Sequence, residues 1–203
     1  AITGGEILAK TYGNEQQILN FLGAKDESSD LRLALLGTLS EKDYYDCRAD
    51  ELDDAFDHAI QWKDKFTREV FVKYLLCPRV GMEILSPWRK ALAERFSDAE
   101  KAEFVRDPRT IAQWIQKNIS HIPQEEYDTL LTNPLGLQSM KHGSKNSCSI
   151  LFVAICRSLG IPARLAVDDG RPQFWSSDFQ QFEDALQSEE NGVRMPFILT
   201  TSE

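Results

Sequence analysis

The sequence has few of the residues on which most metal and thiol chemistry depends. Its 203 residues include 4 cysteines and 3 histidines, and no two cysteines form a CxxC pair. Zinc sites need such residues in clusters at short spacing. The pattern therefore predicts no metal site, and nothing in the chain indicates a cofactor.

Long hydrophobic runs are also missing. The longest, near Ile150–Ile155, is far shorter than the 20 or so apolar residues that cross a bilayer, so we expect no transmembrane segment. The first residues do not read as a charged stretch followed by an apolar one. Two alternatives stay open: the chain is cytosolic, or a signal was removed before Ala1.

The charge of the chain is strongly acidic. It carries 23 basic and 32 acidic residues, for a net charge of −9. Such a chain repels nucleic-acid phosphates and anionic lipids, so the sequence predicts that it has no nucleic-acid partner.

The cysteines lie far apart in the sequence. Cys148 and Cys156 are expected on one helix, about 12 Å apart along its axis, which is too far for a disulfide. A bridge that involves Cys47 or Cys77 stays open at this level. Apolar neighbours favour Cys77 and Cys156 as small buried hydrophobic residues.

Apolar stripes at helical spacing run through the first half of the chain. Several helix starts carry capping signals, which we assign to Ser86-Pro87, Ser97–Glu100 and Asp107-Pro108. Between Ser120 and Gly143 the pattern breaks, and we predict a long loop that bears function.

A strongly apolar helix is predicted from Ser144 to Leu159. Its composition leaves little polar face, so it should be central and buried, with Gly160 as a left-handed cap. Strands are expected at 163–167 and 173–175, joined by a tight turn at Asp169-Gly170, with another at 195–199. The type of the 178–187 segment stays undecided. The fold class is α+β: mostly helical, with a buried central helix packed on a small antiparallel sheet late in the chain.

The end of this helix carries a specific resemblance. Residues 151–164 read LFVAICRSLGIPAR, which closely resembles the end of the nucleophile helix in transglutaminase-like proteins. These proteins have a papain-like core. Weaker similarity at Trp114-Ile115 and at 77–80 resembles exported bacterial multidomain proteins. The resemblance implies a helical module at 1–66 and a transglutaminase-like core at 67–203, incomplete at its C-terminal end.

The resemblance also implies where a catalytic cysteine would lie, which is twelve residues before the arginine of the motif. Counting back from Arg157 reaches Lys145. Cys148 is displaced by about 60° around the helix and about 4.5 Å along it, which is too far for it to inherit the role. Lys145 could itself act as a nucleophilic or clamping amine, but a solvated lysine is the simpler interpretation.

The family also supplies a histidine after the helix, and here every histidine precedes it. The sequence therefore favours a domain that has lost thiol catalysis and acts in binding or scaffolding within a larger exported bacterial protein. The alternative is an active cysteine acyl-transferase or peptidase in which His142 or His121, or a histidine beyond residue 203, activates Cys148.

The aromatic residues that follow the predicted hairpin suggest a binding surface. Phe174 and Trp175, with Phe179 nearby, could line a groove for a peptide or glycan. Core packing of the same rings is the competing interpretation. The remaining expected partners are neighbouring domains of the full-length protein.

Overall fold

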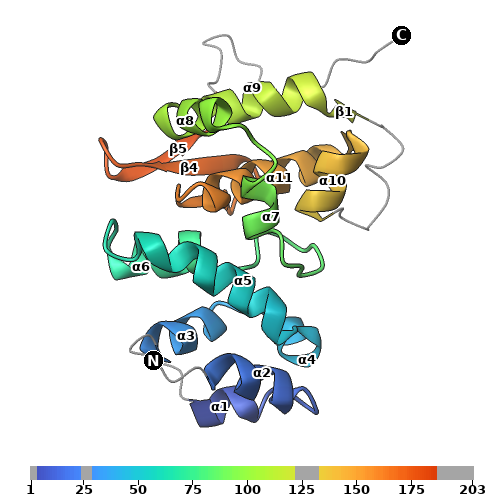
Figure 1. Cartoon of the computed structure of the whole chain (residues 1–203), viewed down its shortest axis with the longest axis vertical. Coiled ribbons are helices and arrows are strands. Elements are labelled where there is room, and N and C mark those ends of the chain that lie inside the picture. The colour runs from blue at the N-terminus through green and yellow to red at the C-terminus, as the bar shows by residue number, and fades with distance from the viewer. Residues whose placement is uncertain (1–3, 24–28, 122–132, 187–203) are drawn as a thin grey trace.

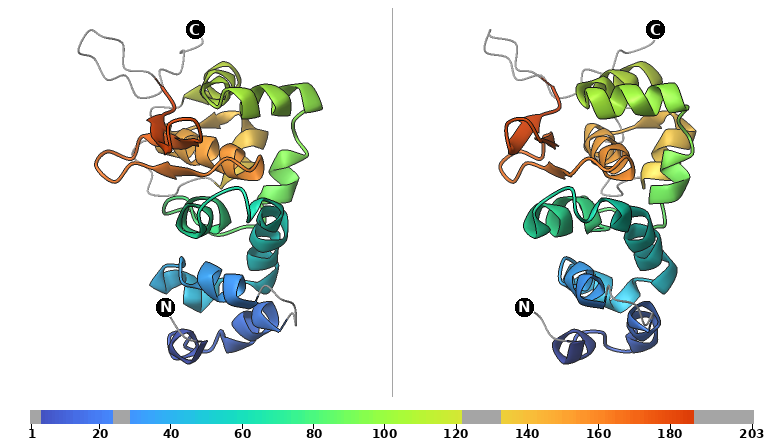
Figure 2. Two further views of the ribbon diagram at one scale, coloured as in Figure 1. Left: turned by 90° about the vertical axis from the view of Figure 1, so that its left-hand side faces the viewer. Right: turned by 60° about the vertical axis from the view of Figure 1, so that its left-hand side comes forward.

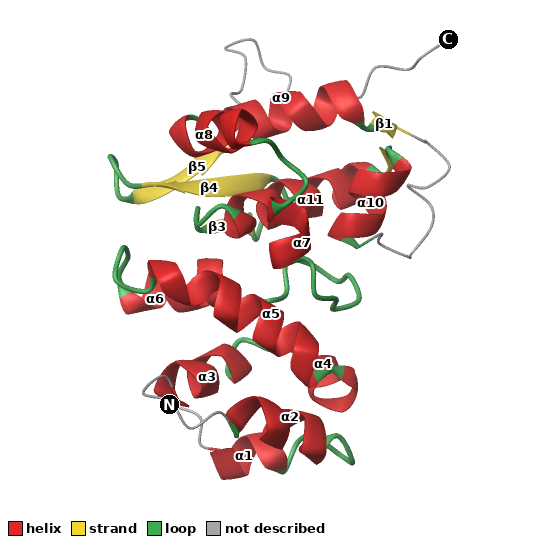
Figure 3. Cartoon of the chain, viewed as in Figure 1, coloured by secondary structure: helices red, strands yellow, loops and turns green. Residues whose placement is uncertain are grey.

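The computed structural model describes residues 4–23, 29–121 and 133–186. Helices dominate these residues, and a small sheet lies in the upper half of the molecule (Figure 3). The chain forms two stacked halves, with the N-terminal helices at one end and α8 and α9 at the other (Figures 1 and 2). This confirms the predicted α+β class.

The first half is built from short helices. Their bounds are α1 Gly4–Leu8, α2 Glu15–Leu22, α3 Ser29–Leu36, α4 Glu41–Asp46, α5 Ala49–Ala59, the 3₁₀-helix η1 Ile60–Trp62, α6 Arg68–Phe71 and the π-helix η2 Val72–Leu76. Their apolar faces meet in one hydrophobic cluster that extends from Ile7 to Leu85. Burial of these faces, more than helix propensity, stabilises helices this short.

The second half contains the long helix and the sheet. Its elements are α7 Arg89–Ala93, α8 Asp98–Arg106, α9 Arg109–Asn118, β1 Ser120–His121, α10 Pro134–Met140, β2 His142–Gly143, α11 Lys145–Ser158, β3 Ala163–Leu165, β4 Pro172–Ser176 and β5 Gln181–Asp184. A second hydrophobic cluster begins at Trp88 and ends at Ala185. The first hydrophobic cluster thus ends at Leu85 and the second begins at Trp88. The domain boundary predicted between residues 66 and 67 stays a prediction.

Helix α11 is the central element of the second half. Every residue from Ser147 to Ser158 is buried, as the nearly continuous apolar sequence predicts. The hydroxyl of Ser144 caps the helix by accepting a hydrogen bond from the Ser147 N–H at 3.1 Å. Gly160 follows the helix with φ +79°, in agreement with the predicted left-handed cap.

The sheet that packs on α11 is antiparallel and ordered β3-β4-β5. Strand β3 pairs with β4 so that Ala163 lies opposite Phe174, and β4 pairs with β5 so that Trp175 lies opposite Phe182. A hairpin joins β3 to β4 as predicted, but its turn is not tight, because β3 ends at Leu165 and β4 begins only at Pro172. The undecided 178–187 segment contributes β5. The strand predicted at 195–199 lies outside the described residues.

Of two helix starts that the sequence predicts, one needs correction and one is confirmed. Ser86 does not cap α7, because the carboxylate of Asp54, on α5, accepts hydrogen bonds from the N–H groups of Arg89 (2.8 Å) and Lys90 (3.3 Å). A cap supplied by a distant helix leaves no local pattern in the sequence. By contrast, the Ser97–Glu100 capping box forms as predicted at the start of α8.

The segment from Ser120 to Gly143 is not simply a loop. Asn133 caps α10 by accepting a hydrogen bond from the Gly136 N–H at 2.8 Å, with Pro134 at the first helical position. The Asn133-Pro134 pair falls inside the loop that the sequence predicts for this segment, although proline is also favoured in the first turn of a helix. Strands β1 and β2, on either side, pair in parallel.

Buried arginines join the two halves. The Arg157 guanidinium, on α11, donates hydrogen bonds to the carbonyl oxygens of Cys77 (2.8 Å), Arg79 (2.7 Å) and Ala163 (2.9 and 3.0 Å). The buried side chain of Arg89 donates to the Leu76 and Cys77 carbonyls. These bonds attach the segment after η2 to the second half.

Within the described residues, none of the helices combines the length and the apolar character needed to cross a bilayer.

Candidate functional site

The start of α11 is where the sequence places the reactive position. Lys145 is the first helical residue and is half-buried, whereas Cys148 lies one turn further along. The Cys148 side chain has 0% of its surface exposed and belongs to the hydrophobic cluster of the second half. The first turn of the helix therefore presents an amine, and the thiol lies inside the core.

The parallel pairing of β1 with β2 brings two histidine backbones to the segment that leads into α11. Ser120 lies opposite His142, and His121 lies opposite Gly143. The side chain of His142 is exposed. The sequence could not show this juxtaposition, because the two paired segments lie far apart in the chain and no local pattern marks their pairing.

His58 lies at the opposite end of α11. Its Nε2 atom is 2.8 Å from the carbonyl oxygen of Ser158, and its ring packs edge-to-face on Trp62 with centroids 5.5 Å apart. It therefore joins α5 to the end of α11, far along the helix from Cys148.

Two other thiols are poor nucleophiles for electrostatic reasons. Burial raises the pKa of Cys156 far above its ordinary value. Burial, followed by the negative charge of Asp43, raises the pKa of Cys47 to about 12. Nucleophilic thiols need the opposite shift, towards the thiolate. All four cysteines are free, so neither Cys47 nor Cys77 forms the disulfide that the sequence left open.

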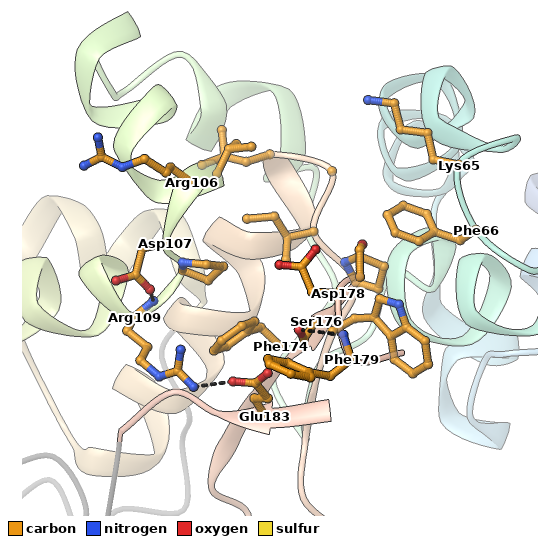
Figure 4. Close-up of a pocket in the computed structure, with 18 of the residues that line it drawn as sticks. Lys65, Phe66, Arg106, Asp107, Arg109, Phe174, Ser176, Asp178, Phe179 and Glu183 are labelled. Atoms are coloured by element: carbon orange, nitrogen blue, oxygen red, sulfur yellow. Dashed lines mark hydrogen bonds and ion pairs between the residues drawn. The ribbon is translucent and has the colours of Figure 1, made fainter. Parts of the chain in front are cut away.

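A cavity of about 450 Å³ opens at the C-terminal end of α11 (Figure 4). Its size lies in the range of roughly 300–1,000 Å³ typical of small-ligand sites. Four segments enclose it: the turn after α5, the α8–α9 junction, the end of α11 and the β4–β5 hairpin. The lining residues are Trp62, Lys65, Phe66, 105–109, 159–162, 174–179 and Glu183. Both halves of the chain therefore contribute to the wall of the cavity.

Five aromatic residues line this cavity. Trp62 packs directly over Gly160, where an added Cβ would lie 2.4 Å from the indole. Trp175 is fixed by edge-to-face contact with Phe182, with centroids 5.2 Å apart. Phe174 is buried, whereas Phe179 is 69% exposed. Trp62 and Trp175 are therefore held in place by neighbouring residues.

The charged side chains of the cavity fall into two groups. Arg109 forms an ion pair with Glu183, and this contact holds the pKa of the Glu183 carboxyl below its usual range. The Cζ atom of Arg109 also lies 5.0 Å from the centroid of the Phe174 ring. Lys65, Arg106 and Asp178 are exposed, and among the described residues their side chains have no hydrogen-bond or ion-pair partner. The second group is therefore available to a ligand.

Comparison with protein families decides the ancestry of the second half. Residues 90–190 match the model of the Transglutaminase-like superfamily. This part of the chain belongs to the transglutaminase-like superfamily. The superfamily domain includes α11, the sheet and most of the cavity wall, whereas helices α1–α6 lie outside the match. Neither curated proteins nor solved structures gave a match.

The site residues that the sequence predicts lie in two separate regions of the transglutaminase-like domain. Lys145, Cys148, His142 and the backbone of His121 lie near the start of α11, and Phe174 and Trp175 lie at the cavity near its other end. Within residues 4–23, 29–121 and 133–186, no group of three or more His, Cys, Asp or Glu side chains is placed to hold a metal ion.

Sequence reasoning missed the part of the cavity that comes from outside the superfamily domain. Trp62 and Phe66 line it from the turn after α5, about 100 residues before the aromatic hairpin. No local motif marks these residues, because they become neighbours of the hairpin only when the two halves pack.

Proposed function

We propose that this transglutaminase-like domain has lost thiol catalysis and acts as a ligand-binding domain. The observation that carries the proposal is the amine of Lys145 in the first turn of α11, at the position where the resemblance expects a thiol. A thiol is activated there by the free N–H groups and the dipole of the helix, which stabilise its anion. An amine at this position cannot supply the thiolate on which the covalent chemistry of a thiol enzyme depends.

The cavity supports a binding role. Its lining residues include aromatic and charged side chains but neither cysteine nor histidine. It therefore offers contact surface and hydrogen-bonding groups without the nucleophile and base of a thiol enzyme. A peptide or a glycan matches such a surface, and a scaffolding role towards neighbouring domains is compatible with it.

One observation favours the active-enzyme alternative. The β1–β2 pairing places the backbones of His121 and His142 beside the segment that leads into α11. If an imidazole from this segment reached Cys148, it could deprotonate the thiol, since thiol–imidazole pairs are defined by geometry and not by order in the sequence. The complete burial of Cys148 opposes this alternative, because a substrate must reach the sulfur.

A turnover assay separates the two functions. The wild-type protein and Cys148→Ala are incubated with a glutamine-containing peptide and a fluorescent primary amine, with an active transglutaminase as the positive control. We expect no product above buffer for either form. Product formed by the wild type and abolished in Cys148→Ala would establish the enzyme and overturn the proposal.

We also propose that the domain works inside a larger exported bacterial protein. The support is the similarity of residues 77–80 and of Trp114-Ile115 to segments of such proteins. Fractionation of the source cells, followed by immunoblotting, should locate the protein outside the cytosol. A signal confined to the cytosolic fraction would contradict export.

A further inference from the structure

We propose that the cavity between the two halves binds an uncharged saccharide. This inference rests on the proposed function, since it names the ligand class of the same binding site. Three observations support it: the charges in the cavity balance, neighbouring residues hold two of its aromatic rings in place, and several of its backbone N–H groups already donate hydrogen bonds.

The charges in the cavity cancel. Lys65, Arg106 and Arg109 are matched by three carboxylates, those of Asp107, Asp178 and Glu183. A ligand with a large charge of either sign would find like charges at the wall, which opposes binding. The net charge of −9 on the chain further disfavours phosphate-bearing ligands. The cavity therefore favours a ligand without net charge.

The aromatic rings suit a flat ligand with an apolar face. Trp62 and Trp175 are held by Gly160 and Phe182, respectively, so their rings lose little freedom when a ligand arrives. Pyranose rings present C–H bonds on their faces and hydroxyl groups at their edges. Stacking on an indole buries the C–H face and leaves the hydroxyls free to form hydrogen bonds.

Charged side chains at the cavity wall can form hydrogen bonds with those hydroxyls. Asp178 projects into the cavity between the α8–α9 wall and Phe66 (Figure 4). Its carboxylate accepts hydrogen bonds, whereas Lys65 and Arg106 donate them from two different walls. Because these three side chains have no partner among the described residues, a polyhydroxyl ligand can pair with them without breaking an existing bond.

A peptide fits the cavity less well. One common way to recognise an extended peptide is through free backbone groups at a strand edge. In this cavity the N–H groups of Ile161, Trp175 and Phe179 already donate to the Cys156 and Pro162 carbonyls and to the Ser176 hydroxyl. These N–H groups are therefore not free to pair with a peptide backbone, which favours recognition by side chains and hence a saccharide.

Titration of intrinsic tryptophan fluorescence tests the inference, since Trp62 and Trp175 line the cavity. The probes are cellotriose, maltotriose and N-acetylglucosamine trimer, with trialanine as the peptide probe. We expect a saturable change with at least one saccharide. Phe179→Ala and Asp178→Asn should each weaken binding by about threefold to tenfold.

Both substitutions are at exposed positions, so the fold should persist. Met82→Ala is the matched control, because Met82 is 85% exposed and does not line the cavity; it should leave binding unchanged. Saturable binding of trialanine with no response to any saccharide would overturn the inference and leave the proposed function standing. Equal saccharide binding by the wild type, Phe179→Ala and Asp178→Asn would place the site elsewhere and also overturn it.

Discussion

Replacing Arg157 with methionine is expected to lower the free energy of unfolding by about 3–5 kcal/mol. Arg157 is 3% exposed, and its guanidinium donates hydrogen bonds to the carbonyl oxygens of Cys77, Arg79 and Ala163. Methionine fills similar volume but leaves these buried acceptors without their donors. Urea unfolding, followed by circular dichroism, measures the loss.

Two further variants show whether geometry or charge is responsible. Arg157→Lys keeps the charge but cannot reach three carbonyls in fixed directions, so it should lose nearly as much stability as methionine. Arg48→Met removes an exposed guanidinium that pairs with Asp50 and should change stability little. A loss below about 1 kcal/mol for Arg157→Met would contradict the anchoring role of this arginine.

Replacing Asp43 with asparagine is the second change with a large expected effect. The fully buried carboxylate receives two hydrogen bonds from the Arg79 guanidinium, which also donates to the Gly81 and Glu83 carbonyls. Asp43→Asn leaves a largely buried guanidinium without its counter-charge, so the free energy of unfolding should fall by about 3–5 kcal/mol. Asp46→Asn, on the exposed face of the same helix, is the matched control.

Because of the same Asp43 carboxyl, we expect the free energy of unfolding to depend on pH. Burial alone would raise the pKa of Asp43, but hydrogen bonds from Arg79 and Ser40 hold it below its ordinary value of 3.8. The pKa of Asp43 is thus lower in the folded chain than in the unfolded chain. Asp43 therefore stabilises the fold fully above about pH 4, and this stabilisation is lost as the pH falls through the folded pKa. Wild type should therefore lose stability on acidification more steeply than Asp43→Asn, and parallel acid profiles would contradict this.

Local patterns in the sequence account for the elements whose causes are local. The apolar composition of 145–158, the cap at Ser144 and the left-handed Gly160 predict α11, and the Asp169-Gly170 turn predicts the hairpin. The cap of α7 was assigned to the wrong residue because Asp54 supplies it from another helix. The helix after Asn133 was missed because Asn-Pro is a signal both for loops and for helix starts.

The candidate site residues likewise fall into those that a local pattern marks and those that depend on contacts between distant parts of the chain. Phe174 and Trp175 could be selected because they follow a recognisable hairpin, and Lys145 because the spacing to Arg157 places it. The cavity could not be predicted from the sequence, because Trp62 and Phe66 reach it only through the packing of the two halves. The approach of the β1 backbone to β2 likewise depends on the path of the chain.

The rate at which iodoacetamide alkylates Cys148 tests the loss of thiol catalysis most directly. Peptide-resolved mass spectrometry would follow the rate between about pH 5 and 8. We predict labelling slower than that of the urea-unfolded chain throughout this range, and unchanged in His121→Ala and His142→Ala. Rapid labelling at about pH 6 that either histidine substitution abolishes would show an activated thiol and contradict the account.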